Sequence, residues 1–216
     1  SVLSVSSSSN NDTYKIGDEL VLTVQFNEVV NVGGVPQLTL ETGNIDGVAS
    51  YSIGSGTNTL SFAYAVVLNH ASADLEYNST SALSLNNGTV QDLAGNNVSL
   101  TLPTIGETGS LATNKALVID GVYATVDSVS ATTANGYYKA GDTLDVTVHF
   151  DENVNVTGSP QLVLETGSND ATVYYSSGSG SSILSFQYIA EEGHLNTDLE
   201  YVSALSLSLN NGLIRD

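Results

Sequence analysis

The feature that most constrains the fold is an internal repeat. The motif Tyr-Lys-x-Gly-Asp at residues 14–18 returns at residues 138–142, an offset of 124 residues. Motifs of the form Pro-Gln-Leu, Glu-Thr-Gly and Asp-Leu-Glu-Tyr return at the same offset without a gap. Because self-similarity over this length indicates repeated folding units, we expect two domains. The first covers residues 1–121 and the second covers residues 122–216.

The second copy is shorter than the first. Its last residue, Asp216, aligns with Asp92, so the second copy contains no equivalent of residues 93–121. We therefore expect an incomplete second domain with an open sheet edge. A neighbouring chain could cover that edge, or the sequence could be cut or permuted relative to these domain boundaries. The chain does not begin with Met, and we expect it to be an excerpt of a longer protein.

Hydrophobic alternation predicts β-strands in both copies. Apolar and polar residues alternate along residues 20–26 and again along 144–150, which is typical of half-buried strands. Clusters of Gly, Asn, Asp and Ser separate the candidate strands, and no segment shows helical periodicity over ten residues. The pattern predicts an all-β fold of two tandem sandwiches. Further strands are expected at residues 37–41, 48–53, 59–66, 83–85, 97–102 and 116–119.

The charge balance excludes several classes of partner. The chain contains 4 Lys and Arg residues and 23 Asp and Glu residues, which gives a net charge of −19. Such a chain repels nucleic acids and anionic membrane surfaces, whereas its negative field attracts cations such as Ca²⁺. The chain contains no Cys, which excludes disulfides and thiolate metal sites. No apolar run approaches the ~18 residues of a membrane span, so we expect no membrane insertion.

The repeated motifs resemble those of bacterial immunoglobulin-like repeats. The resemblance rests on Tyr-Lys-x-Gly-Asp, on Pro-Gln-Leu-x-Leu-Glu-Thr-Gly and on the later Leu-Asn-Asn-Gly-Thr-Val-Gln-Asp-Leu-Ala-Gly-Asn. Such repeats occur in tandem in long secreted surface adhesins of the RTX type. The resemblance implies immunoglobulin-like sandwiches, an extracellular location, type I secretion and a spacer role. It also implies Ca²⁺ where neighbouring repeats of one chain join, with any host or surface ligand bound by other domains.

Strand topology suggests where Ca²⁺ would bind. The first strand of a domain leaves the linker and the second returns antiparallel to it, so the end of the second strand lies back at the linker. Oxygen ligands suit Ca²⁺. The carboxylates expected at the junction are Asp120, Asp151, Glu152 and Asp216. A partner cluster is expected at the front of the first copy, without an upstream linker aspartate, and its residues are Asn27, Glu28, Asp92 and Asn96. The alternative is that all eight are ordinary solvated turn residues.

Other polar residues give weaker signals. Asp74 and Glu76 are alternate residues at a strand start, which predicts two carboxylates on one face and allows a second Ca²⁺ site. His70 and His194 occupy equivalent loops, and we expect exposed polar side chains there. No motif indicates an enzyme, and duplicated acids favour structure over catalysis. A glycan- or protein-binding module is the alternative function, for which the doubled tyrosines Tyr137-Tyr138 and Tyr174-Tyr175 of the second copy are the signal.

Overall fold

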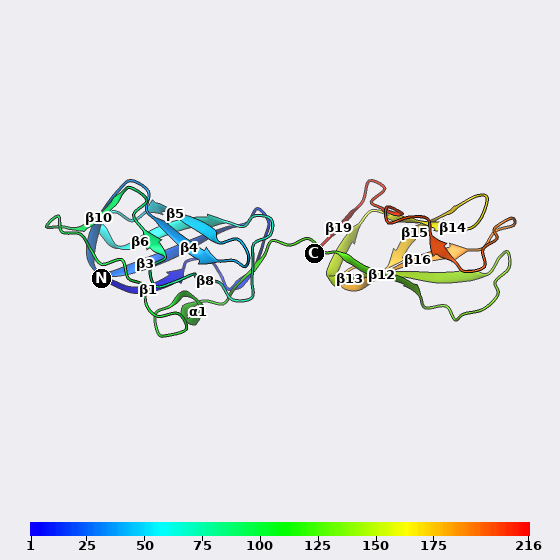
Figure 1. The fold of residues 1–216 in the computed structure, drawn as a ribbon, viewed down its shortest axis with the longest axis horizontal. Coiled ribbons are helices and arrows are strands. Elements are labelled where there is room, and N and C mark those ends of the chain that lie inside the picture. Colours follow the sequence, from blue (N-terminus) through cyan, green and yellow to red (C-terminus); the bar gives the residue numbers. More distant parts are fainter. The chain divides into compact units, whose positions relative to one another are not determined.

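A computed structural model describes residues 1–216 as two compact units, Ser1–Val122 (unit 1) and Tyr123–Asp216 (unit 2) (Figure 1). Each unit contains strands almost exclusively, and nearly all of its strand pairs are antiparallel. The predicted all-β class is therefore confirmed. The boundary lies one residue after the one expected from the repeat.

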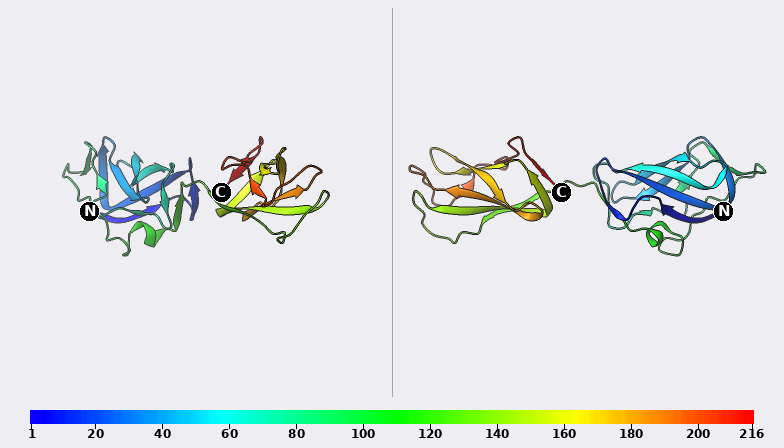
Figure 2. Two further views of the ribbon diagram at one scale, coloured as in Figure 1. Left: turned by 45° about the vertical axis from the view of Figure 1, so that its right-hand side comes forward. Right: turned by 180° about the vertical axis from the view of Figure 1, so that it is seen from behind.

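The main sheet of unit 1 has the strand order β1-β3-β6-β5-β4-β8, and the short strands β9 and β10 pair with β4 and β3. Successive strands are joined by Gly-rich and Asn-rich turns, because these residues tolerate positive φ. The sheet curls around its core, as the two views in Figure 2 show. The strands are β1 (Val2–Ser7), β3 (Glu19–Gly33), β4 (Gln37–Glu41), β5 (Gly47–Ile53), β6 (Thr57–Ala65), β8 (Glu76–Tyr77), β9 (Leu83–Ser84) and β10 (Thr89–Asp92).

The long strand β3 organises this sheet. Its first half pairs with β1 and β6, and its second half pairs with β10. The register against β6 breaks between Gln25 and Val30, an irregularity of the kind that bends a strand. The alternation that predicted the strand is visible in its burial, because Leu20, Leu22 and Val24 are fully buried. Burial of each such side chain contributes about 1.5–3 kcal/mol to folding.

A second, three-stranded sheet closes unit 1. It consists of β2 (Asp12–Lys15), β11 (Leu117–Asp120) and β7 (Ala71–Ser72), in the order β2-β11-β7. Strand β11 runs parallel to β2 and antiparallel to β7. The one-turn helix α1 (Leu111–Asn114) precedes β11 and packs near β1 and β8. Leu111, Leu117 and Ile119 from this segment are all buried in the core of unit 1.

Unit 2 repeats the main sheet of unit 1 in the order β12-β13-β16-β15-β14-β17, with β18 and β19 paired to β14 and β13. Residues 123–216 form no counterpart of the three-stranded sheet of unit 1. The strands are β12 (Val126–Ala131), β13 (Thr143–Thr157), β14 (Gln161–Glu165), β15 (Ala171–Ser177), β16 (Ser181–Ile189), β17 (Glu200–Tyr201), β18 (Leu207–Ser208) and β19 (Leu213–Arg215).

One predicted strand is wrong. Residues 97–102 alternate in polarity but form no ladder beyond a single bridge between Asn97 and Gln91. Their backbone bonds instead reach two separate places, because the N–H of Val98 donates to the carbonyl of Val90 in β10 and that of Leu102 donates to the carbonyl of Thr80 in a turn. The alternation reflects Leu102 entering the core from an irregular segment. No helix in the structure is long and apolar enough to cross a membrane.

Candidate functional site

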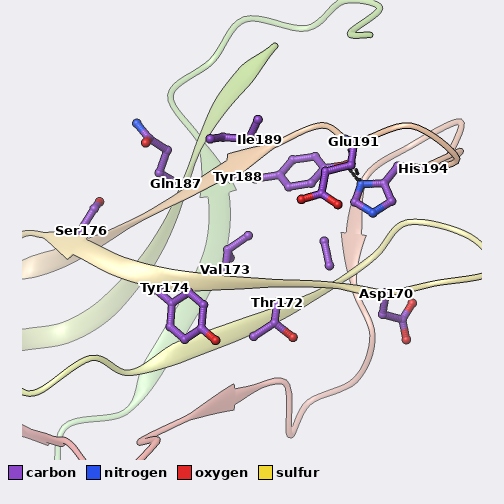
Figure 3. A pocket seen from close by; sticks show the side chains of 11 residues that line it. Asp170, Thr172, Val173, Tyr174, Ser176, Gln187, Tyr188, Ile189, Glu191 and His194 are labelled. Atoms are coloured by element: carbon purple, nitrogen blue, oxygen red, sulfur yellow. Dashed lines mark hydrogen bonds between the residues drawn. The ribbon is translucent and has the colours of Figure 1, made fainter. Parts of the chain in front are cut away.

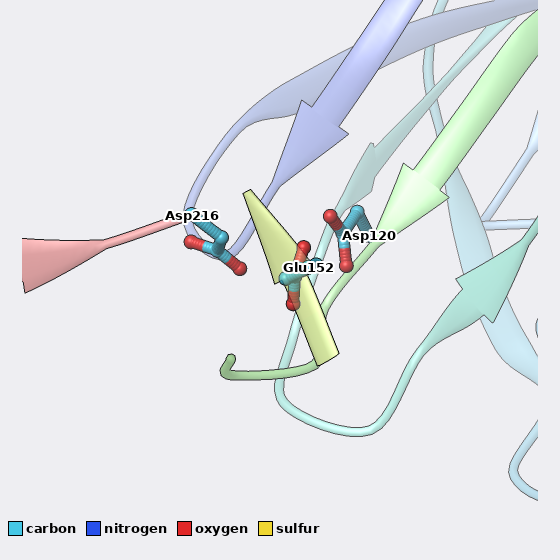
Figure 4. A group of neighbouring side chains, drawn as sticks. All are labelled: Asp120, Glu152 and Asp216. Atoms are coloured by element: carbon cyan, nitrogen blue, oxygen red, sulfur yellow. The ribbon is translucent and has the colours of Figure 1, made fainter. Parts of the chain in front are cut away.

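Two carboxylates of unit 2 lie close together where β19 pairs with β13. Strand β19 runs antiparallel to the second half of β13, with Arg215 opposite Asn155. Glu152 lies in β13 and Asp216 directly follows β19, so the ladder brings the two residues together. A carboxylate oxygen of Glu152 lies within 4.8 Å of one of Asp216, and both side chains are half-buried (Figure 4).

The donor set of this pair fits a hard cation. Ca²⁺ binds oxygen ligands at about 2.3–2.6 Å, so two oxygens on one ion lie up to about 5 Å apart. The Glu152–Asp216 separation of at most 4.8 Å satisfies that limit. Carboxylates also suit Ca²⁺ better than they suit softer metals. The pair can supply two of the six to eight ligands of a Ca²⁺ ion.

The neighbouring Asp151 has a different role. Its carboxylate accepts hydrogen bonds from the N–H and the hydroxyl of Thr125, each at 2.7 Å. These bonds, that of the backbone N–H first, hold the pKa of Asp151 below its usual value. Its backbone N–H donates to the carbonyl of Thr125 at 3.1 Å. Asp151 therefore fastens the start of unit 2 to β13.

Asp120, the fourth carboxylate expected at the junction, belongs to unit 1. It is the last residue of β11, where it lies opposite Lys15 of β2 and Ala71 of β7. Its side chain is half-buried. The two sheet neighbours of β11 fix the backbone position from which this carboxylate projects.

The residues expected at the front of unit 1 are Asn27, Glu28, Asp92 and Asn96, and local hydrogen bonds join two of them, Asp92 and Asn96. Asp92 ends β10 and accepts bonds from the N–H of Ala94 and from the N–H and side-chain amide of Asn96, at 2.8–2.9 Å. The Asn96 side chain is the largest cause of a lowered pKa at Asp92. Asn27 accepts a bond from the amino group of Ser1. Glu28 lies in β3, two residues before Val30, which is opposite Asp92.

The predicted shared face of Asp74 and Glu76 is wrong. Asp74 is exposed, whereas Glu76 is buried with 8% of its surface accessible. Its carboxylate accepts the N–H groups of Leu111 and Ala112, each at 3.1 Å, at the start of α1. Glu76 therefore anchors the closing segment of unit 1. No sequence pattern indicates this contact, because the two partners lie 35 and 36 residues away along the chain.

The prediction of exposed loop histidines is wrong for His70. Only 5% of its surface is accessible, and its Nδ1 lies 2.7 Å from the hydroxyl of Tyr64. The two rings are nearly parallel, with centroids 5.9 Å apart. His194 is half-buried and repeats the contact with Tyr188 at 2.9 Å. Recurrence of both residues at the repeat offset was the only sequence signal for this pair.

Unit 2 also has a surface hollow of about 470 Å³ between β15 and β16 (Figure 3). Tyr174, Tyr188 and His194 line it, together with the carboxylates Asp170 and Glu191. Tyr174 is 52% exposed. The equivalent residue of unit 1 is Ser50, so this aromatic side chain is specific to the second copy.

Comparison with protein-family models, with curated proteins and with solved structures found no match.

Proposed function

We propose that the chain is a pair of structural spacer repeats from an extracellular bacterial surface adhesin, stiffened by Ca²⁺ where repeats join. The single observation that carries this proposal is the tandem duplication of a complete main sheet, with each copy built around its own core. A duplicated domain suits a spacer, because each added repeat increases the length of the protein. The adhesin and its extracellular location rest on the resemblance of the repeat motifs.

The Glu152–Asp216 pair supports the metal part of the proposal. Five peptide units separate Asp120 from Thr125. Thr125 is hydrogen-bonded to Asp151, the residue that precedes Glu152 in β13. An extended chain spans at most about 3.6 Å per residue, so Asp120 is tethered within about 18 Å of that threonine. Asp120 can therefore serve as a third ligand from the preceding repeat. A bound Ca²⁺ would also offset part of the repulsion within a chain of net charge −19.

The test is thermal unfolding of the chain with and without millimolar Ca²⁺, with Mg²⁺ as the comparison ion. Binding to the folded state raises the unfolding midpoint by mass action. We expect a Ca²⁺-specific rise that Glu152→Gln and Asp120→Asn each reduce. The matched control is Glu192→Gln, which removes an exposed carboxylate of unit 2 outside the pair and leaves the rise intact. Equal midpoints with and without Ca²⁺ would contradict the metal part of the proposal.

Tyr174 favours a second candidate function, the binding of a glycan or a protein loop by unit 2. An exposed tyrosine beside carboxylates can stack on a sugar ring while the acids accept its hydroxyl protons in hydrogen bonds. Screening the chain against immobilised glycans tests this candidate. Binding that disappears in Tyr174→Ser, the residue type found in unit 1, would support it, and a screen without binding would count against it.

A further inference from the structure

The hollow of unit 2 lies where two neighbouring strands diverge. The ladder between β15 and β16 runs from Ser177 to Tyr174, which lies opposite Gln187, and no further pair follows. Beyond that pair, β15 stays paired with β14, and β16 stays paired with β13. The two strands therefore separate, and the hollow lies between them (Figure 3).

The residue at position 171 limits how far a tyrosine ring can fill this divergence. In unit 1 the equivalent residue is Gly47, and a Cβ built there would lie 2.8 Å from Cε2 of Tyr64. The ring of Tyr64 therefore rests directly on the glycine. Unit 2 has Ala171 at this position. Its methyl group prevents the ring of Tyr188 from packing as closely.

The walls of the hollow face outward from the sheet. They come from alternate positions of β15 and β16 that are exposed, next to residues that are buried. The wall residues are Thr172, Tyr174, Gln187 and Ile189. Val48, Ala63 and Ala65 are equivalent positions of unit 1 and are exposed as well, although residues 93–121 close one side of that unit. Exposure of this surface therefore does not depend on the closing segment.

The side chains of the walls are specific to unit 2. Tyr174 stands where unit 1 has Ser50, and Ile189 stands where unit 1 has Ala65. Tyr174 and Ile189 are each 52% exposed. These larger side chains give the hollow an aromatic and aliphatic wall that unit 1 lacks.

Two carboxylates lie at one end of the hollow. Asp170 directly precedes β15, and Glu191 follows the end of β16 by two residues. Because the two strands are antiparallel, these positions lie at the same end of the sheet. Both residues line the hollow and are exposed. Unit 1 has Val67 at the position of Glu191, so this charge is specific to unit 2.

Asp170 lacks the internal partner that its equivalent has. In unit 1 the carboxylate of Asp46 accepts a hydrogen bond from the side-chain amide of Asn78 at 2.9 Å. The residue equivalent to Asn78 in unit 2 is Val202, whose side chain cannot donate. The carboxylate of Asp170 is therefore available to a ligand.

A local hydrogen bond fixes the backbone that carries Glu191. Its N–H donates to Nδ1 of His194 at 3.2 Å, and the same Nδ1 lies 2.9 Å from the hydroxyl of Tyr188. Burial first and the charge of Glu191 second raise the pKa of Tyr188. The negative charge of Glu191 therefore acts on the floor of the hollow.

No basic residue balances these charges. None of the four Lys and Arg residues of the chain lines the hollow. A third carboxylate, Asp145 of β13, lies opposite Gln187 of β16, where unit 1 has Val21. The hollow thus combines an exposed tyrosine with uncompensated negative charge, and both features attract a cationic group.

We propose that the hollow of unit 2 binds an arginine side chain of a partner protein. The guanidinium group pairs with Asp170 and Glu191, and the rest of the side chain lies against Tyr174. A guanidinium suits this site better than an ammonium, because it is planar, stacks on aromatic rings and presents several N–H donors in a fixed fork. A neutral sugar would leave both carboxylates without a counter-charge. The inference rests on the second candidate function, which it narrows to one chemical class.

The experiment titrates the isotope-labelled full-length chain with the peptide acetyl-Gly-Arg-Gly-amide and follows the backbone amides by NMR. A matched peptide contains citrulline, which keeps the shape of arginine without its charge. We expect saturable shifts at residues 170–176 and 187–194 with the arginine peptide and none with the citrulline peptide. The equivalent residues of unit 1, 46–52 and 63–70, provide an internal reference and should not shift. A lysine peptide should bind more weakly.

Three variants test the residues involved. Tyr174→Ser introduces the residue of unit 1 and should weaken binding about two- to fivefold, through loss of a cation–π contact at an exposed site. Asp170→Asn should weaken binding by a similar factor, about two- to fivefold. The matched control is Asp127→Asn, which removes an exposed carboxylate of β12 outside the hollow and leaves the affinity unchanged. All three positions are exposed, and the spectrum of each free variant verifies that it is folded.

Several results would overturn the proposal. They are equal shifts with the citrulline peptide, equal affinity for the lysine peptide, shifts spread over both units, and an affinity unchanged in both Tyr174→Ser and Asp170→Asn. Absence of shifts at millimolar arginine peptide would overturn it as well. If a glycan then bound at the same residues, the second candidate function would survive with a sugar as its ligand. The Ca²⁺-dependent unfolding midpoint tests the spacer proposal separately.

Discussion

The hydroxyl of Tyr64 lies 2.7 Å from Nδ1 of His70 inside unit 1, and the same contact recurs between Tyr188 and His194 in unit 2. Both rings of the first pair are almost inaccessible, whereas His194 is half-buried. The contact joins the end of β6 or β16 to the loop that follows it. The same hydrogen bond is therefore buried in unit 1 and partly accessible to solvent in unit 2.

The first prediction concerns this pair. Tyr64→Phe leaves the buried Nδ1 of His70 without its partner, which costs about 1–3 kcal/mol. Tyr188→Phe should cost less, because water can reach His194. Urea unfolding of the two variants measures both free energies. A larger loss in Tyr188→Phe than in Tyr64→Phe would contradict the difference in burial.

The second prediction concerns alkaline pH. Burial raises the pKa of Tyr64 from 10.0 to about 12, and burial followed by the charge of Glu76 raises that of Tyr77 to about 12. The folded state therefore keeps these protons while the unfolded chain loses them. The resulting stabilisation is complete below pH 10.0 and disappears as the pH rises towards 12.

Ultraviolet absorbance of phenolate, followed during a pH titration, checks this prediction. We expect a late-titrating fraction that coincides with loss of β-structure in the circular dichroism spectrum. Tyr77→Phe should reduce the fraction, and Tyr137→Phe, a fully exposed control, should reduce only the early part. A single transition of all tyrosines near pH 10.0, with the fold intact, would show that the burial has no such effect.

The third prediction compares Glu76 with Glu200. Glu76→Ala removes the acceptor of two N–H groups at the start of α1 and should lower the free energy of unfolding by about 1.5–3 kcal/mol. Glu200→Ala at the exposed equivalent should stay within about 0.5 kcal/mol. Urea unfolding measures both. Equal losses would mean that the contact of Glu76 with the start of α1 adds nothing to stability.

The fourth prediction concerns the turn between β5 and β6. Gly54 has φ +116, and a Cβ there would lie 2.3 Å from the carbonyl oxygen of Thr59. Gly54→Ala therefore combines backbone strain with a clash and should cost more than about 2 kcal/mol. Gly56→Ala, at φ +82 with no atom within 4 Å, should cost about 1 kcal/mol. Thermal unfolding of the two variants checks which of them loses more stability. A larger loss in Gly56→Ala than in Gly54→Ala would exclude the clash.

The sequence predicted the elements whose side chains alternate against a core. Residues 20–26 and 144–150 were identified because their alternation has the period of a strand, and β3 and β13 contain them. The further extent of β3 to Gly33 was missed, since the register irregularity before Val30 interrupts the pattern. Helix α1 was missed because four residues are too few to show a helical period.

The candidate site was predictable only in part. Strand order alone suggested that Glu152 and Asp216 approach the same end of unit 2, and their carboxylates lie within 4.8 Å of each other. The role of Asp151 was not foreseen, because its bonds to Thr125 depend on side-chain rotamers. Glu76 is buried by a segment that lies 35 residues further along the chain. His70 is buried by the packing of the core around it. A pattern of neighbouring residues encodes neither effect.

The parallel pairing of β11 with β2 also bears on mechanical load. Leu117, Val118, Ile119 and Asp120 lie opposite the four residues of β2. Tension applied along the chain beyond Asp120 acts along the axis of β11, so the two strands are sheared rather than peeled apart. All four pairs must then rupture together, which demands more force than opening them one after another. A molecule tethered at a surface and pulled at its far end would therefore lose unit 1 abruptly rather than gradually.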